Sequence, residues 1–173
     1  SLETPATQAD AVNFRAMVNA ALESIGKGDI YQVNLSWAVT DISVRDPIAS
    51  YLALRRENPA ERSAFLKIGD WTILSNSPEL FLSVEPREGH LFASSIPIKG
   101  TARDGSEASR TTLRDSAKET AELTMIVDLV RNDLGRVARP GSVHAGPRTL
   151  RSCGDLLHAE QVVSARLLPD KDS

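Results

Sequence analysis

Residues 63–98 constrain the fold of this chain more than any other stretch, because four β-type segments follow one another there with only short turns between them. The segments are Ala64–Ile68, Trp71–Ser75, Glu79–Glu85 and Leu91–Ile98. Gly69-Asp70, between the first two, is a glycine-first pair typical of a two-residue hairpin turn. Parallel neighbours need a crossover of a dozen or more residues, so these strands are predicted to form an antiparallel meander.

Helical segments are expected on both sides of this β region. Apolar residues recur at three- and four-residue spacing over 8–27, and the glycines that follow supply a stop. Asp46-Pro47 begins a second helix that ends near Asn58, with Asp as N-cap and Pro at the first helical position. A long helix is expected from Thr111 to Leu134, after a loop over 105–110. Its second half is apolar on nearly all sides, which predicts burial on several faces.

The remaining segments complete an α+β pattern. Alternating apolar and polar residues predict a half-buried strand over 30–40. Short strands are expected at 142–145 and 162–168. Helices and strands do not alternate as they do in a parallel α/β protein. The predicted class is therefore α+β, with antiparallel β-sheet layers flanked by helices, in a 173-residue chain that suits one domain.

Composition excludes several classes of function. The net charge of −3 gives no electrostatic reason to expect nucleic acid or an anionic membrane as a partner. No apolar run reaches the length of a membrane-spanning helix, and the first residues do not resemble a signal peptide. Cys153 is the only cysteine, so an internal disulfide and a thiolate zinc site are excluded, in keeping with a cytoplasmic protein.

The pentapeptide 97–101, Pro-Ile-Lys-Gly-Thr, is the leading candidate for a functional site. It places Lys99 between an expected strand end and a glycine turn, just before a hydroxyl residue. A lysine that is desolvated in a pocket can act as a nucleophile near neutral pH. Most lysines are instead solvated surface charges, so the motif gains its weight from the segments around it.

Glu79 follows Ser77-Pro78 at the start of an expected strand. A carboxylate fixed behind a proline and next to Leu80 and Phe81 is expected to be partly desolvated, which suits general acid–base chemistry. The competing interpretation is a strand-edge glutamate that faces water.

Glu119 and Glu122 lie three residues apart on the expected long helix and therefore on one face of it. Two carboxylates at the point where a helix becomes buried need a compensating cation, and Mg²⁺ is the usual one. The alternative is that Lys118 and Arg114 neutralise the pair on a solvent-exposed face.

Further charges lie within the apolar half of the same helix, at Asp128, Arg131 and Asp133. Buried charges are costly unless they are paired. This group is therefore interpreted as a buried ion-pair network that supports a site. The three histidines at 90, 144 and 158 show no metal-ligand spacing.

Taken together, these segments resemble the chorismate-utilising enzymes. The matching segments are Gly28–Leu35, Ile73–Glu79, Pro97–Thr101, and Glu122–Asp133 with Gly135–Val137. They occur in the family's order over nearly the whole chain. The resemblance implies part of the chorismate-binding, anthranilate synthase component I-like fold. Within the family, lysine at position 99 is typical of the aminodeoxychorismate synthase branch, whereas anthranilate synthases typically carry alanine there.

The resemblance also implies roles for individual residues. Lys99 would attack C2 of chorismate and expel the C4 hydroxyl, with Glu79 as the general acid–base. Ammonia, supplied by a glutamine amidotransferase subunit or domain, would then add at C4 and yield 4-amino-4-deoxychorismate. By the same resemblance, the substrate-binding residues are Gly100, Thr101 and Gln161, and the ligands of an Mg²⁺ cofactor are Glu119 and Glu122.

The resemblance implies that residues 1–173 form a partial catalytic domain, which lacks the family's N-terminal region and roughly the last hundred residues. Strand edges left open by the missing part predict self-association or packing against a further segment. Many relatives carry a histidine where Gln161 stands, and glutamine cannot shuttle a proton. The alternatives to amination are an anthranilate synthase, an isochorismate or salicylate synthase, and a truncated module without catalytic activity.

Overall fold

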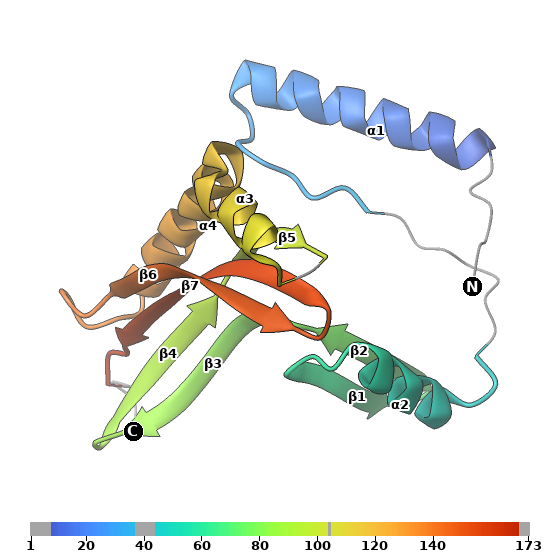
Figure 1. Ribbon diagram of the computed structural model, residues 1–173. Helices are drawn as coiled ribbons and strands as arrows, with labels where there is room; N and C mark the ends of the chain where they lie inside the picture. Colours follow the sequence, from blue (N-terminus) through green and yellow to red (C-terminus); the bar gives the residue numbers. More distant parts are fainter. Residues whose placement is uncertain (1–7, 37–43, 104, 170–173) are drawn as a thin grey trace. The chain divides into compact units, whose positions relative to one another are not determined.

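The computed structural model of this chain describes residues 8–36, 44–103 and 105–169, and it divides the chain into two compact units, residues 1–43 and 44–173. Helices and antiparallel strands occur together in it, which confirms the predicted α+β class (Figure 1). Among the described residues, no helix combines the length and the apolar character needed to cross a membrane.

The first unit contributes helix α1 (Gln8–Lys27), whose bounds agree with the prediction. The helix ends where Gly28 adopts a φ of 79° and its amide donates to the Ile25 carbonyl at 3.0 Å. Glycine is favoured there because other residues rarely adopt a positive φ. The predicted strand is wrong for residues 30–36, because they pair with no strand among the described residues. A strand needs a partner that binds its backbone N–H and C=O groups. Residues 37–40 lie outside the described part.

The second unit holds the other described elements. They are α2 (Pro47–Glu57), β1 (Arg62–Ile68), β2 (Trp71–Ser77), β3 (Leu80–Arg87), β4 (His90–Ile96), β5 (Ile98–Ala102), α3 (Glu107–Asp115), α4 (Ala117–Gly135), β6 (His144–Cys153) and β7 (Leu156–Arg166). Helix α2 begins as predicted, because the Asp46 side chain accepts the Ala49 amide at 3.0 Å and Pro47 stands at the first helical position.

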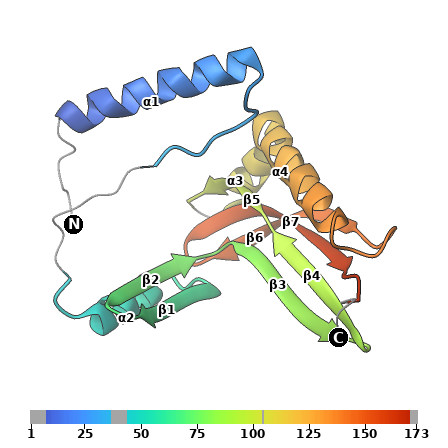
Figure 2. The same cartoon turned by 180° about the vertical axis from the view of Figure 1, so that it is seen from behind.

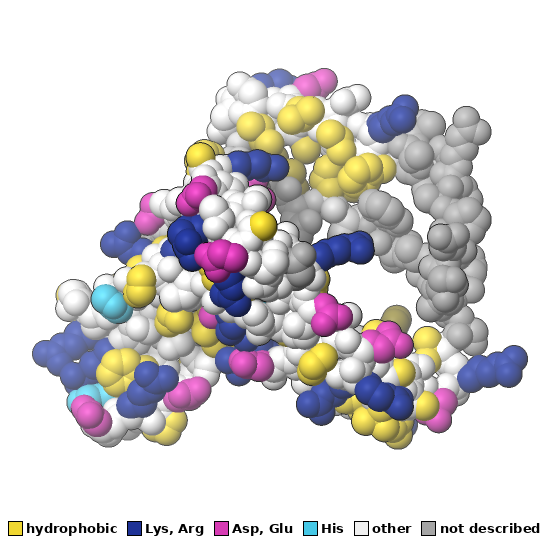
Figure 3. All heavy atoms as spheres, in the orientation of Figure 1, with side chains coloured by type: hydrophobic (Ala, Val, Ile, Leu, Met, Phe, Trp, Pro, Cys, Tyr) yellow, Lys and Arg dark blue, Asp and Glu magenta, His cyan; other side chains and the backbone are white. Residues whose placement is uncertain are grey.

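The predicted hairpin is confirmed, but the predicted meander is wrong. β1 and β2 pair with each other in a two-stranded sheet, whereas β3 and β4 belong to a five-stranded one. The chain changes sheet at Pro78, which has no N–H to donate to a ladder. Apolar side chains lie at the surface of the region formed by α2, β1 and β2, where Trp71 is 78% exposed (Figure 3).

Strand β7 lies at the centre of the five-stranded sheet. β6 pairs with one edge of it, and β4 and β5 pair with the other. Pro97 separates β4 from β5, and β3 pairs with the outer edge of β4. The strands predicted at 142–145 and 162–168 are parts of the longer β6 and β7. The sheet therefore joins segments that lie far apart in the sequence.

The single helix predicted over 111–134 is two helices. Ser106 and Ser116 act as N-caps of α3 and α4, and their hydroxyls accept the amides of Ser109 and Glu119 at 3.2 Å. The predicted loop over 105–110 is correspondingly wrong, since α3 begins at Glu107. Serine favours such caps because its hydroxyl competes for backbone hydrogen bonds.

Helix α4 lies along one face of the five-stranded sheet (Figures 1 and 2). The core between them consists of Ala93, Leu123, Val127, Leu134, Ala138, Val163 and Ala165. The prediction that this helix is buried on several faces is wrong, because Leu129 of α4 is 55% exposed.

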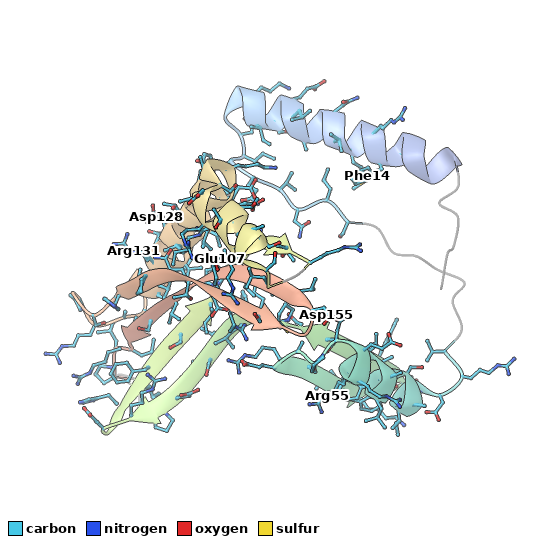
Figure 4. All side chains as sticks on the ribbon, in the orientation of Figure 1. Phe14, Arg55, Glu107, Asp128, Arg131 and Asp155 are labelled. Atoms are coloured by element: carbon cyan, nitrogen blue, oxygen red, sulfur yellow. The ribbon has the colours of Figure 1, made fainter. Side chains whose placement is uncertain are left out.

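The predicted buried ion-pair network is also wrong. Asp128 and Arg131 do form a pair at 2.9 Å, but their side chains are 61% and 52% exposed (Figure 4). Asp133 is exposed as well. All three side chains are exposed, so no burial penalty has to be compensated there.

Candidate active site

Lys99 and Gly100 form a bulge in β5. Ile98 pairs with Glu160 of β7 and Thr101 pairs with His158, so two β5 residues stand opposite one β7 residue. Gly100 has a φ of 86°, which few other residues adopt without strain. Bulges interrupt pairing and redirect side chains. The lysine predicted to be functional therefore lies, half-buried, at the irregular point of the strand.

The start of α4 lies close to this bulge at Gly100. A Cβ at position 100 would lie 3.1 Å from Leu113 Cδ2 and 3.2 Å from Glu119 Oε2. Both distances are shorter than ordinary van der Waals contacts, so the missing side chain lets the Glu119 carboxylate approach the strand backbone. The structure thus brings together two of the predicted segments, the pentapeptide and the acidic helix start.

The Glu79 side chain also contacts β5, at the residue before Lys99. The Ile98 amide donates to its Oε1 at 3.0 Å, and its own amide donates to Ser77 Oγ at 3.2 Å. The carboxylate is therefore held beside the backbone that leads into Lys99. The expected partial desolvation is wrong in the described structure, where Glu79 is exposed, because the neighbouring Phe81 is itself 89% exposed and does not cover it.

Glu119 and Glu122 lie on one face of α4, as predicted, and both are half-buried. Lys118 Nζ lies 3.9 Å from Glu122 Oε1, so part of the alternative interpretation also holds. No group of three or more His, Cys, Asp or Glu residues suited to a metal occurs in the described ranges. Two adjacent carboxylates still fit Mg²⁺, which commonly takes one or two protein carboxylates and completes its shell with water and substrate.

Gln161 lies beside the pentapeptide, because its backbone amide donates to the Pro97 carbonyl at 3.3 Å. Its side-chain nitrogen donates to the Gly146 carbonyl at 2.8 Å, which ties it to β6. Because side chains alternate along β7, Gln161 shares the face of the core residue Val163, opposite that of His158. Thr101, by contrast, is exposed and has its hydroxyl 2.9 Å from His158 Nδ1.

His158 is a candidate that the sequence reasoning missed. It is 5% exposed, and its Nε2 has no hydrogen-bond partner among the described residues. Such an atom is available to a ligand, because buried polar groups rarely remain unpaired. The available signal was a lone polar ring in the apolar run 156–159 of a central strand.

Arg151 and Glu160 were also missed, although they form the tightest charged contact next to the site. Arg151 Nε lies 2.7 Å from Glu160 Oε2, and the side chains are 26% and 10% exposed. The same guanidinium donates to the Pro78 carbonyl at 2.9 Å and lies 3.2 Å from Glu61 Oε2. Pro78, Glu160 and Glu61 lie 73, 9 and 90 residues from Arg151 in the sequence, so no local pattern reveals the cluster.

The burial of His158 predicts a pH-dependent stability. Burial lowers the pKa of its imidazole below the usual 6.5, and the charge of Arg151 lowers it further. At a pH between the folded and the unfolded pKa of His158, the unfolded chain binds one more proton than the folded chain. The stability that the neutral, buried imidazole contributes is therefore complete above about pH 6.5 and is lost as the pH falls through the folded pKa. We expect the free energy of unfolding to fall more steeply from about pH 7.5 to about pH 5 in the wild type than in His158→Gln.

The exposed His144 supplies the control for this measurement. His144→Gln should retain the pH slope of the wild type in urea titrations at each pH. Identical slopes for wild type and His158→Gln would contradict the prediction.

Comparison with known proteins identifies the family. Residues 2–173 match the chorismate binding enzyme family. An aminodeoxychorismate synthase of Streptomyces griseus is 40% identical over 146 residues, which cover 80% of this chain and 19% of that protein. An anthranilate synthase component 1 of Methanothermobacter thermautotrophicus is 38% identical over 167 residues, which cover 92% of this chain and 35% of that protein.

A solved structure supports the same assignment. Anthranilate synthase component I from Streptococcus pneumoniae superimposes with a TM-score of 0.70 at 31% identity, over 91% of this chain and 34% of that one. The chain spans between about a fifth and about a third of the length of these proteins. Since the family match covers nearly every residue, the chain belongs to the chorismate binding enzymes.

Proposed function

We propose that this chain is part of an enzyme that converts chorismate and ammonia to 4-amino-4-deoxychorismate. The observation that carries the proposal is the bulge at Lys99. The half-buried Lys99 follows Ile98, whose amide binds the Glu79 carboxylate, and precedes Gly100, beside which the Glu119 carboxylate lies. A lysine nucleophile with a carboxylic acid near it suits a substitution in which a hydroxyl group must be protonated before it leaves.

In the first step, Lys99 Nζ, as the free amine, forms a bond to C2 of chorismate. The two ring double bonds shift from C1–C2 and C5–C6 to C1–C6 and C4–C5, and the C4–O bond breaks. Glu79 gives a proton to the departing hydroxyl, which leaves as water. Gly100 allows the backbone to approach the ring closely, and Thr101 contacts the substrate from the next position in β5.

In the second step, ammonia forms a bond to C4, the two ring double bonds shift back to C5–C6 and C1–C2, and the bond between C2 and Lys99 Nζ breaks. The new ammonium group returns a proton to Glu79, and Lys99 leaves as the free amine. The enzyme therefore ends in its starting state, and the net change is ammonia in and water out. Gln161 contributes a substrate contact through Oε1, because its side-chain nitrogen is bound to Gly146.

Glu119 and Glu122 are the residues that would hold Mg²⁺. When bound, the ion compensates the negative charge of the substrate carboxylate. The two glutamates would position it at the start of α4, close to the Lys99 bulge.

The ammonia source we propose is a glutamine amidotransferase subunit or domain, and the compartment is the reducing cytoplasm. The protein of Streptomyces griseus named above carries the name of the aminating reaction. Two other proteins named above are anthranilate synthases, which makes anthranilate formation the second candidate. Lys99, which the anthranilate branch typically replaces by alanine, favours the first.

Product identification on the full-length chain tests the proposal. The assay combines chorismate, Mg²⁺ and an ammonium salt and separates the products by chromatography and mass. A product with an amino group at C4 and the pyruvyl group retained supports it. Anthranilate, isochorismate or salicylate would overturn the assigned reaction, and the absence of any product would favour the non-catalytic module.

A further inference from the structure

We propose that Arg151 is a positioning residue, which holds the Pro78–Glu79 segment in place for the chemistry at Lys99. The inference rests on the proposed function, in which Glu79 is the general acid–base. Arg151 itself touches no reacting group and acts through the backbone next to Glu79.

Three contacts define the Arg151 side chain. It reaches from β6 to Glu160 on β7 at 2.7 Å, to the Pro78 carbonyl at 2.9 Å and to Glu61 at 3.2 Å. The guanidinium group is planar and carries five donors, so it can bind several acceptors in fixed directions at once. A lysine ammonium lacks this fixed geometry.

Glu160 makes the arrangement rigid. Its side chain is only 10% exposed, and a carboxylate that is buried this far is strongly destabilising without a partner. The Arg151–Glu160 contact is therefore obligatory rather than one of several surface alternatives. This contact also fixes the position from which Arg151 donates to the Pro78 carbonyl.

The contacts close into a ring around the site. Arg151 binds Glu160, Glu160 lies opposite Ile98 in the β5–β7 ladder, the Ile98 amide binds the Glu79 carboxylate, and Pro78 returns to Arg151. Glu79 is thus held at both ends, through its carboxylate by β5 and through the preceding carbonyl by β6. Without Arg151, Glu79 would keep the contact of its exposed carboxylate with β5 and the bond of its amide to Ser77, but no tie to β6.

The consequence is a specific kinetic defect. Small displacements of a catalytic group cost up to about a hundredfold in rate. In the full-length chain, Arg151→Met should lower kcat by about tenfold to about a hundredfold and change KM by less than about threefold. Glu61→Gln, which removes only the most exposed of the three partners, should leave kcat within about twofold of the wild type.

A double-mutant cycle distinguishes positioning of Glu79 from general loss of structure. If Arg151 acts through Glu79, Arg151→Met should lower the rate by less than about twofold in a Glu79→Gln background. An equal reduction in both backgrounds would overturn the proposal. A wild type that forms no aminated product would instead overturn the proposed function, so the two failures are distinguishable.

Arg151→Lys keeps the test meaningful if Arg151→Met does not fold. Lysine keeps the charge that Glu160 needs but not the planar fork. We expect a folded protein, checked by thermal unfolding, with kcat still lowered by about tenfold. Full activity of Arg151→Lys would show that charge alone suffices and would overturn the positioning role.

Discussion

Replacement of Lys99 by alanine is expected to lower product formation by at least about a thousandfold, because loss of a nucleophile removes the covalent route entirely. The folded state should tolerate this change, since Lys99 is half-buried in a bulge and forms no ion pair within the described structure. Initial rates with saturating chorismate, Mg²⁺ and ammonium salt measure the effect.

Lys67 provides the matched control. It is an exposed strand lysine on β1, and Lys67→Ala should keep the wild-type rate within about twofold. Near wild-type activity of Lys99→Ala would eliminate the lysine mechanism. It would also remove the main reason to prefer amination at C4 over anthranilate formation.

Gly100→Ala is expected to destabilise the folded protein by about 2–4 kcal/mol. Two effects add. An alanine at a φ of 86° costs about 1–2 kcal/mol, and its Cβ would press on Leu113 Cδ2 at 3.1 Å and on Glu119 Oε2 at 3.2 Å. Urea unfolding of the wild type and variant measures the difference in free energy.

Gly141→Ala separates these two contributions. Gly141 has a φ of 78°, and no neighbouring atom lies within 4 Å of the position that a Cβ would take, so alanine there should show only the conformational cost of about 1–2 kcal/mol. Equal destabilisation at both positions would mean that α4 can move away from the bulge without cost. The close approach of Glu119 would then be incidental.

Local patterns predicted the elements whose causes are local. The bounds of α1 follow from three- and four-residue spacing and a glycine stop, and α2 follows from the cap at Asp46. The β1–β2 hairpin follows from the turn at Gly69-Asp70. In each case the stabilising contact joins residues within one turn of one another, so the sequence window contains it.

The errors arose where distant segments decide the outcome. The predicted meander is wrong because Pro78 ends one sheet, while β4 is paired by β7 from the C-terminal part of the chain. The long helix divides at Ser116, whose hydroxyl binds an α4 amide instead of continuing the helix. The charges at Asp128 and Arg131 were expected to be buried because an apolar helix does not show which of its faces meets a sheet.

For the site, local sequence patterns identified the chemical groups that are present: the lysine and glycine of the pentapeptide, the glutamate after Pro78 and the acidic pair at the start of α4. The contacts between these groups depend on the tertiary fold. The Ile98 amide reaches Glu79 across 19 residues of sequence, and Gly100 admits Glu119 because two backbones approach closely there. His158 and Arg151 join the site only through the β6 and β5 ladders on β7. A residue's chemistry is carried by its own side chain, whereas its neighbours are set by strand pairing over long distances in the sequence, which no local pattern encodes.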